Sequence, residues 1–272
     1  MGAPDRYAIR EAAEVHFYDL SDGSFVTTLD TLKNATMTVS GETVYARGGR
    51  GNPKLVGFSG DKEARLELED ALFTNESWML LTGHDAEKGK KVVGWNEIKQ
   101  VDENDKITLD KTPADDPDGN PKIDGVFKVN ADGSNGTEIT KAEGTLASGE
   151  YEISGNEITF FEDEFDEGTW MRVYYRIETD DEATTNKLTS DMFGGSYRIE
   201  CDVLVRSLDT KEDYEGRLII NNGKIESDFE FEFSPEGDPS TQNVPIEVLR
   251  DPITDDMWEL IVFDQDKAGV NS

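Results

Sequence analysis

Apolar and polar residues alternate along much of this chain, which is the pattern of β-strands that bury one face and expose the other. The segment Glu63–Glu69 shows it most clearly. Ala64, Leu66 and Leu68 fall on one face, and charged residues fall on the other. Such strands are typical of antiparallel sheets with one solvated side. The pattern therefore predicts a sheet that covers a core on one side only.

Similar runs predict about ten strands in total. Val15–Leu20 and Phe25–Leu29 flank the turn residues Ser21-Asp22-Gly23 and predict a hairpin. The other expected strands are Ala35–Val39, Lys90–Trp95, Tyr151–Ile153, Glu157–Phe161, Trp170–Glu178, Tyr197–Arg206, Arg217–Ile220, Ile225–Phe233 and Trp258–Phe263.

One segment predicts a helix with a clear start and end. Thr74 can cap its N-terminus, Trp78 and Leu81 belong to its apolar side, and Gly83 can end it. A second, short helix is expected around Asp5–Ala13. The chain is thus predicted to contain many strands and few helices.

These elements predict a mainly β protein, with a sandwich or barrel-like fold, one flanking helix and extended loops. Between Asp102 and Gly149 the strand pattern weakens into acidic sequence with Gly, Asn and Pro. We therefore expect three parts. Residues 1–101 form the N-terminal part of the β core with a long loop and the helix, residues 102–149 an acidic insertion or subdomain, and residues 150–272 the C-terminal part of the core.

The charge of the chain excludes several functions. The sequence has 59 acidic and 27 basic residues, a formal net charge of -32. Phosphates are bound by clustered Lys and Arg, so neither a nucleic-acid-binding protein nor a protein of anionic membrane surfaces is expected. Recurring aromatic and β-branched residues disfavour a disordered acidic chain. The solvated surface of a halophilic protein stays open as another reason for the charge.

The sequence offers little for catalysis or metal binding. Cys201 is the only cysteine, His16 and His84 are the only histidines, and none stands in a nucleophile or zinc pattern. The acidic loop Asp115–Gly125 departs from a calcium-binding EF-hand loop, because Pro121 stands where the sharp-turn glycine belongs. A looser carboxylate site stays open there. We expect no catalytic residue, no cofactor and no bound metal.

A glycine-rich and basic segment interrupts the strand pattern after residue 39 and predicts an exposed loop or extended arm. It is no phosphate-binding loop, because Pro53 precedes Lys54 and Leu55 follows it. We interpret the segment as an arm whose basic residues contact carboxylates of a neighbouring acidic subunit, with a flexible loop as the alternative. The residues assigned to this contact are Tyr45, Arg47, Gly48, Gly49, Arg50, Gly51, Asn52 and Lys54.

The order of these segments resembles that of the major tail proteins, or tail tube proteins, of long-tailed bacteriophages. The likeness lies in the loop Tyr45–Asn52, the segment Lys54–Gly83, and a C-terminal part that runs from GGSYRIECDVLVRSLDT through LIINNGKIESDFEFEFSPEGDPS to Pro245–Leu249. It covers the first and last thirds of the chain. The segment Asp102–Gly149 has no counterpart in it.

The resemblance implies a structural protein of the virion, made in the host cytoplasm before assembly. Such proteins form rings, usually hexameric, that stack into a hollow tube through which the genome passes to the host. The implied partners are copies of the same chain, with a tail sheath protein and tail terminator or baseplate proteins beside them. DNA would pass without specific binding, and no membrane is involved.

The resemblance also implies a sheet between subunits that lines the channel. The alternation in SDFEFEFS predicts that Phe229, Phe231 and Phe233 pack inward while the acids between them point to the wet face. Carboxylates on such a wall would repel the DNA backbone. An ordinary solvated face is the alternative for each strand. The candidate acids facing the channel are Glu63, Glu67, Asp228, Glu230 and Glu232.

Two other classes of protein stay open. The first is a monomeric, acidic Ig-like module that binds a ligand or decorates a capsid through its loops. The second is a carbohydrate hydrolase of β fold, since carboxylates are abundant, but that abundance makes any one pair uninformative.

Overall fold

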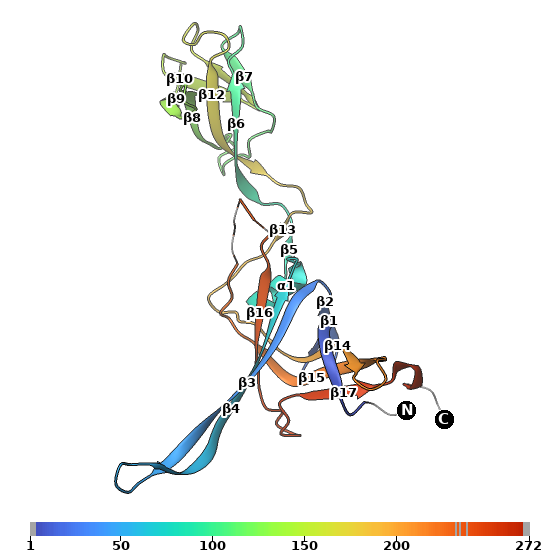
Figure 1. The fold of residues 1–272 in the computed structure, drawn as a ribbon. Helices are drawn as coiled ribbons and strands as arrows, with labels where there is room; N and C mark the ends of the chain where they lie inside the picture. Colours follow the sequence, from blue (N-terminus) through green and yellow to red (C-terminus); the bar gives the residue numbers. More distant parts are fainter. Residues whose placement is uncertain (1–3, 232, 234, 238, 269–272) are drawn as a thin grey trace. The chain divides into compact units, whose positions relative to one another are not determined.

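The fold is described from a computed structural model that covers residues 4–231, 233, 235–237 and 239–268. Its contacts divide the chain into two compact units. Unit 1 combines Met1–Ala86 with Asn186–Ser272, and unit 2 is Glu87–Thr185 (Figure 1). Unit 2 therefore interrupts the sequence of unit 1, and each unit is described by itself.

Unit 1 consists of an eight-stranded, nearly closed, barrel-like sheet with one α-helix. The strand order is β2-β1-β14-β15-β16-β4-β3, and β17 also pairs with β15. All of these pairs are antiparallel. The elements are β1 (Tyr7–Asp19), β2 (Phe25–Leu29), β3 (Leu32–Arg47), β4 (Lys54–Asp70), α1 (Asn75–Thr82), β14 (Ser196–Ser207), β15 (Asp213–Ile225), β16 (Gln242–Val248), β17 (Glu259–Phe263) and the short 3-10 helix η1 (Gln265–Lys267).

The core of unit 1 follows from the alternation predicted for β4. Leu66 and Leu68 are buried, and they pack in one cluster with Phe17 of β1, Ile199 of β14 and Ile246 of β16. The charged residues between them on β4 are exposed or half-buried. β1, β4, β14 and β16 thus each contribute an apolar face to a common interior.

Helix α1 is held by caps at both ends. The Thr74 side chain accepts a hydrogen bond from the Ser77 backbone N–H (3.0 Å), and the Ser77 hydroxyl accepts one from the Thr74 N–H (3.0 Å). Gly83 ends the helix with φ 70°, and a Cβ there would lie 2.3 Å from the Phe193 carbonyl oxygen. The predicted helix is confirmed, with Leu81 buried in the core of unit 1.

Unit 2 is a β fold with a core of its own. Its seven-stranded sheet has the order β6-β12-β8-β9-β10-β11-β7. The unit also contains a separate two-stranded sheet, β13-β5. Buried Ile107, Val126, Ile158 and Val173 belong to one apolar cluster. The strands are β5 (Glu87–Lys88), β6 (Val92–Gln100), β7 (Lys106–Thr108), β8 (Ile123–Val129), β9 (Asn135–Lys141), β10 (Glu150–Ser154), β11 (Glu157–Phe160), β12 (Trp170–Glu178) and β13 (Thr184–Thr185).

The limits of unit 2 differ from those of the insertion expected at residues 102–149. The unit extends beyond that segment on both sides, because β12 pairs with β6 and β8 and joins them in one sheet. The weakly patterned segment itself contains three strands, which is one reason why the described residues hold seventeen strands where the sequence predicts about ten.

Two predictions of secondary structure are wrong. The short helix expected at Asp5–Ala13 is strand, because β1 pairs with β14 from Tyr7 onward and this long-range pairing outweighs local propensity. The strand expected at Ile225–Phe233 ends at Ile225, where β15 stops. β15 pairs with β16 only from Gly223 to Ile225, and one further bond runs from the Glu226 N–H to the Pro245 carbonyl (2.9 Å). Pro245 has no N–H with which to continue the ladder.

Candidate assembly surfaces

The most exposed part of unit 1 is the hairpin formed by the outer halves of β3 and β4. We call residues 41–60 the arm. It extends away from the rest of unit 1 (Figure 1), and Val44, Tyr45, Ala46 and Arg47 pair across it with residues of β4. Side chains on both faces of the arm are exposed. The predicted loop or arm is therefore a two-stranded ribbon, and only its tip is a turn.

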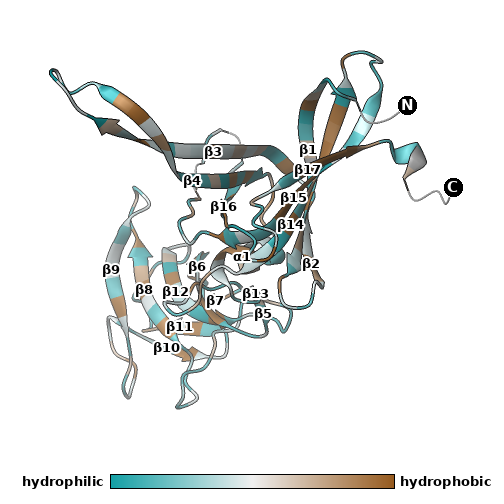
Figure 2. Ribbon diagram, turned by 90° about the horizontal axis from the view of Figure 1, so that it is seen from below, coloured by the Kyte–Doolittle hydropathy of each residue, from teal (hydrophilic) through white to brown (hydrophobic). Residues whose placement is uncertain are grey.

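One face of the arm is apolar. The cross-strand pairs Val44 with Phe58 and Ala46 with Val56 place these four side chains on the same face. The exposed fractions of Val44, Val56 and Phe58 are 57%, 53% and 60%. Figure 2 shows the hydrophobic stretch in the outer part of the arm. An isolated two-stranded ribbon is marginally stable in water, so an apolar face of this kind calls for a partner surface.

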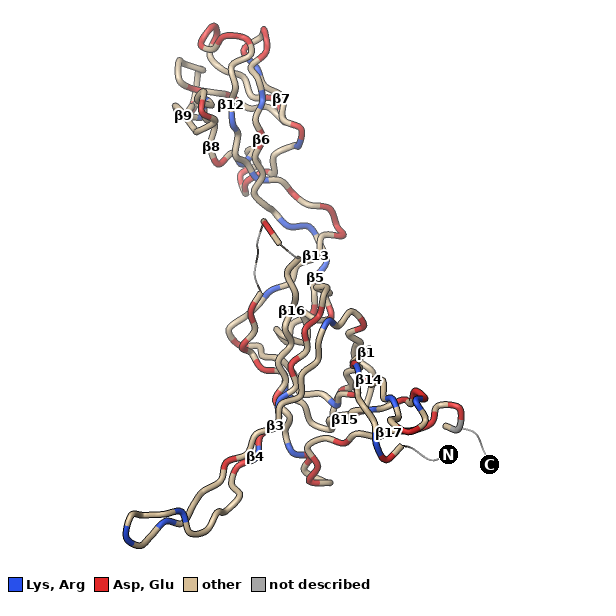
Figure 3. Tube along the Cα trace, in the orientation of Figure 1, with Lys and Arg blue, Asp and Glu red and all other residues tan. Residues whose placement is uncertain are grey.

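The tip of the arm is basic. Arg47 ends β3 and Lys54 begins β4, and the turn between them contains Arg50 (Figure 3). The Lys54 ammonium lies 3.8 Å from the centre of the Tyr45 ring, a cation–π contact. The arm as a whole has three basic residues and one acidic residue. It is a basic segment in a strongly acidic chain.

The turn at the tip depends on its glycines. Gly49 and Gly51 have φ angles of 82° and 89°, in the left-handed region that favours glycine, and Asn52 has φ 49°. The Asn52 N–H donates to the Gly49 carbonyl (3.1 Å), and the Gly48 N–H donates to the Pro53 carbonyl (3.3 Å). All eight residues that the sequence assigns to an inter-subunit contact thus lie in the outer end of one hairpin.

The outer face of β3, β4 and β16 is acidic. Glu67 pairs with Thr36 of β3 and Pro245 of β16, and the buried residues of β4 point away from this face. Arg65 is the basic residue among the β4 side chains of this face, at 3.2 Å from Glu67 and 2.7 Å from Glu226. The wet face predicted for Glu63–Glu69 is therefore present.

The structure brings three of the candidate channel acids together. Glu67, Asp228 and Glu230 line one hollow of about 400 Å³ on unit 1, with Glu69 beside them. Glu63 lies on the same strand as Glu67 but lines a different hollow. Glu232 lies outside the described residues.

The phenylalanines of SDFEFEFS do not all pack inward as predicted. Phe229 is half-buried against the core, whereas Phe233 is 85% exposed. The sequence predicts Phe231 on the inward face of a strand, but its ring contacts Trp78 of α1 edge-on, with ring centres 5.3 Å apart. The predicted helix residue Trp78 also meets Phe229 at 6.3 Å. An aromatic cluster on α1 has replaced the expected β ladder.

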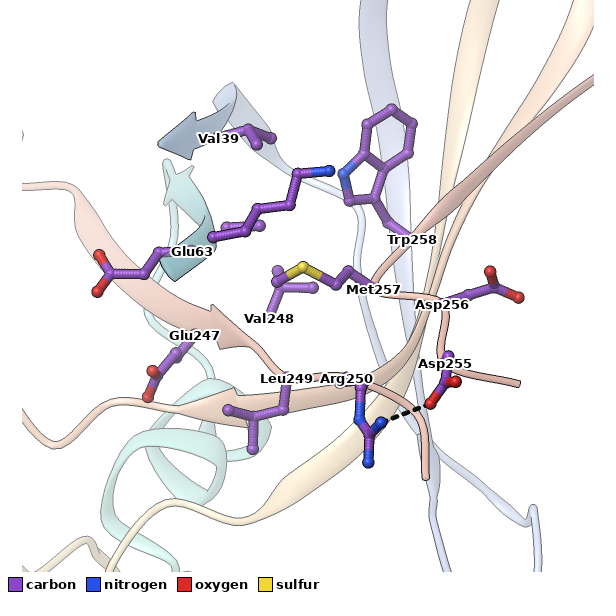
Figure 4. Close-up of a pocket in the computed structure, with 12 residues that line it drawn as sticks. Val39, Glu63, Glu247, Val248, Leu249, Arg250, Asp255, Asp256, Met257 and Trp258 are labelled. Atoms are coloured by element: carbon purple, nitrogen blue, oxygen red, sulfur yellow. Dashed lines mark hydrogen bonds and ion pairs between the residues drawn. The ribbon is translucent and has the colours of Figure 1, made fainter. Parts of the chain in front are cut away.

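A second hollow, which we call the base pocket, lies where the arm joins the sheet. Its volume is about 660 Å³, and it opens between β3, β4, β16 and the segment before β17. In Figure 4 the Met257 side chain reaches into the middle of the hollow, and carboxylates lie around it. The lining residues are Val39, Lys62, Glu63, Ala64, Glu247, Val248, Leu249, Arg250, Asp255, Asp256, Met257 and Trp258.

The base pocket combines an apolar floor with an acidic rim. Trp258 is 41% exposed, although tryptophan is a large apolar side chain. Arg250 of the rim is bound to Asp255 at 2.6 Å. Within the described part of the chain, none of the ion pairs involves Glu63, Glu247 or Asp256. No sequence pattern predicted this pocket, because its lining comes from four separate segments.

Other candidate chemistry is weak in this structure. Glu14, His16 and Asp202 bring their ligand atoms within 4.8 Å of one another, but Arg217 forms an ion pair with Asp202, so a cation is already present there. Cys201 is buried, and burial raises the pKa of its thiol to about 12, which disfavours the reactive thiolate.

The loop that resembles a calcium site is a hydrogen-bonded turn. The Asp116 carboxylate accepts the backbone N–H groups of Asp118 (2.9 Å) and Asn120 (2.8 Å), and these bonds lower the pKa of that carboxyl. The Asp116 carboxylate is therefore already used to stabilise the turn.

A barrel-like β unit with an exposed ribbon and an apolar, charged pocket is typical of a protein that works by associating with other subunits. The chain belongs to the YomU/Tube protein family, whose model matches residues 7–261. This family fits a phage tail tube protein, in agreement with the resemblance seen in the sequence, and it implies a place in the virion. Structural families of this kind are generally non-enzymatic. A search of the curated proteins found no match to the chain. Among the described residues, no helix has the length and apolar character that crossing a membrane requires.

Proposed function

We propose that this protein assembles with copies of itself into rings, six subunits to a ring, that stack into the hollow tube of a phage tail. The arm is the observation that carries this proposal. A monomer that works alone has no use for a ribbon with an exposed apolar face, whereas a tube subunit needs a segment that reaches its neighbour.

The acidic outer face of β3, β4 and β16 is our candidate for the wall of the channel. Glu67, Asp228 and Glu230 gather at one hollow of this face. Carboxylates repel the DNA phosphates, and a surface without clustered Lys and Arg gives no counterion release. DNA would therefore pass along this wall without being held.

Unit 2 has its own core and interrupts unit 1 between α1 and β14. We infer that it is an addition to the tube-forming part and that unit 1 alone supplies the ring. A sheath protein and terminator or baseplate proteins are the partners expected for an assembled tube.

Electron microscopy of the concentrated protein in negative stain tests the proposal. Rings or hollow rods are the expected result. Dispersed single particles at every protein and salt concentration would favour the alternative, a monomeric binding or decoration module.

A further inference from the structure

We propose that the base pocket of one subunit receives the arm of a second copy of this chain. The inference rests on the proposed function and adds to it the surface that the arm contacts. It commits to one occupant: the apolar face and basic tip of the arm, inserted between the apolar floor and the acidic rim of the pocket.

The arm cannot fill the pocket of its own chain. Val39 and Lys62 of the pocket stand at the foot of the arm, and β3 and β4 stay paired from there to Arg47. A paired strand rises about 3.3 Å per residue, so Arg47 lies about 26 Å from Val39 along β3. The occupant must therefore come from another molecule.

The two surfaces are complementary in charge. The arm contributes Arg47, Arg50 and Lys54. The pocket contributes Glu247 and Asp256 at its rim, and neither takes part in the ion pairs of the described residues. In a chain of net charge -32, most surfaces of two copies repel each other. The basic tip of the arm and the acidic rim of the pocket attract each other, and this attraction favours the orientation of two subunits in which they meet.

The two surfaces are also complementary in polarity. The arm presents Val56 and Phe58, and the pocket presents Met257 and exposed Trp258. Methionine adapts to an irregular partner, and aromatic and methionine side chains are enriched at the centres of protein interfaces. A volume of about 660 Å³ is in the range of pockets that enclose most of a bound ligand, which is room enough for more than one side chain.

The contact joins two different surfaces, so it is head-to-tail. Each subunit offers an arm to one neighbour and a pocket to another, and such contacts close into rings or continue as stacks. The arm-in-pocket contact thus accounts for assembly of either kind from one pair of surfaces.

Cysteine cross-linking tests the contact directly. Cys201 is buried and its pKa is raised, so cysteines placed on the surface react in its place. The variant R50C/D256C is expected to give disulfide-linked ladders under mild oxidation. The matched control R50C/D22C pairs the same arm position with another exposed carboxylate of unit 1 and is expected to give no ladder. Equal ladders from both variants, or none from the first, would overturn the inference.

Exchanging the charges of the arm and the pocket tests how much their attraction contributes to assembly. We expect R47E/R50E and E247K/D256K each to weaken assembly about tenfold or more, and the variant with all four changes to regain it. K111E/K122E in unit 2 shifts the net charge as R47E/R50E does and is expected to assemble normally. A fourfold variant no better than either pair would contradict the contact.

The two proposals fail differently. If rods form but neither the cross-link nor the charge rescue appears, the arm binds elsewhere and the pocket assignment is wrong while the tube function stands. If the unchanged protein forms no rings or rods and R50C/D256C gives no ladders at any concentration, both are wrong.

Discussion

Shortening the apolar side chains of the arm separates folding from assembly. Phe58 and Val56 lie on β4, which also carries Leu66 further along. Phe58 is 60% exposed and Leu66 is 1% exposed, so one strand holds both a proposed assembly residue and a core residue. The variant V56A/F58A should therefore lose assembly and keep its fold, whereas L66A should lose stability.

The magnitudes follow from burial. Burying a large apolar side chain contributes about 1.5–3 kcal/mol, so the two arm residues together contribute up to about 3–6 kcal/mol when a neighbour covers them. This corresponds to a dissociation constant raised by about two to four powers of ten. In the free subunit both side chains already contact water, and we expect the free energy of unfolding to change by less than about 0.5 kcal/mol. A buried Leu→Ala change costs about 2–5 kcal/mol.

Two measurements are needed. Sedimentation velocity over a range of protein concentrations gives the strength of assembly, and urea unfolding below the assembly concentration gives the stability of the free subunit. If V56A/F58A assembled like the unchanged protein, the apolar face of the arm would not be an interface. If it lowered the free energy of unfolding as much as L66A, these side chains would already belong to the folded core of the free subunit.

Three further predictions follow from charge, the helix cap and an acidic turn. Assembly should strengthen as salt rises from low concentration, because screening relieves repulsion between subunits of net charge -32; light scattering that falls steadily with salt would refute this. G83A should lower the free energy of unfolding by more than about 1 kcal/mol, since the left-handed φ and the Phe193 carbonyl exclude a Cβ, while G23A in an open turn tests the φ effect alone. The Asp251 carboxylate accepts the N–H groups of Thr254 and Ile253, which lowers the pKa of that carboxyl below 3.8. Its stabilisation is therefore present above pH 3.8 and lost as pH falls through the lowered value, so D251N should show a smaller loss of stability in acid than the unchanged protein.

Sequence patterns predicted correctly those elements that depend only on residues close together in the chain. The alternation at Glu63–Glu69 and the caps Thr74 and Gly83 report burial and hydrogen bonds within one short segment, and each is present in the fold. The same kind of alternation misled at Phe229 and Phe231, because a strand also needs a neighbouring strand to pair with. The pairing of β15 with β16 stops at Ile225, and the two rings pack on Trp78 of α1, a contact that no single segment contains.

The candidate assembly surfaces, too, were predictable only where they depend on one short segment. The basic, glycine-rich stretch around Arg47 and Arg50 marked the arm in the sequence, since composition and turn residues are local. Its extent as a paired ribbon and its apolar face depend on the register of β3 on β4. The base pocket could not be predicted, because Val39, Glu247 and Trp258 meet only after the sheet has formed.

Electron microscopy of the unchanged protein beside V56A/F58A tests the central claim most directly. The claim is that this subunit builds a tube through its arm. The account predicts rings or hollow rods from the unchanged protein and single particles from the variant at the same concentration. Rods of the same kind from both proteins, or single particles from both under every condition, would contradict it.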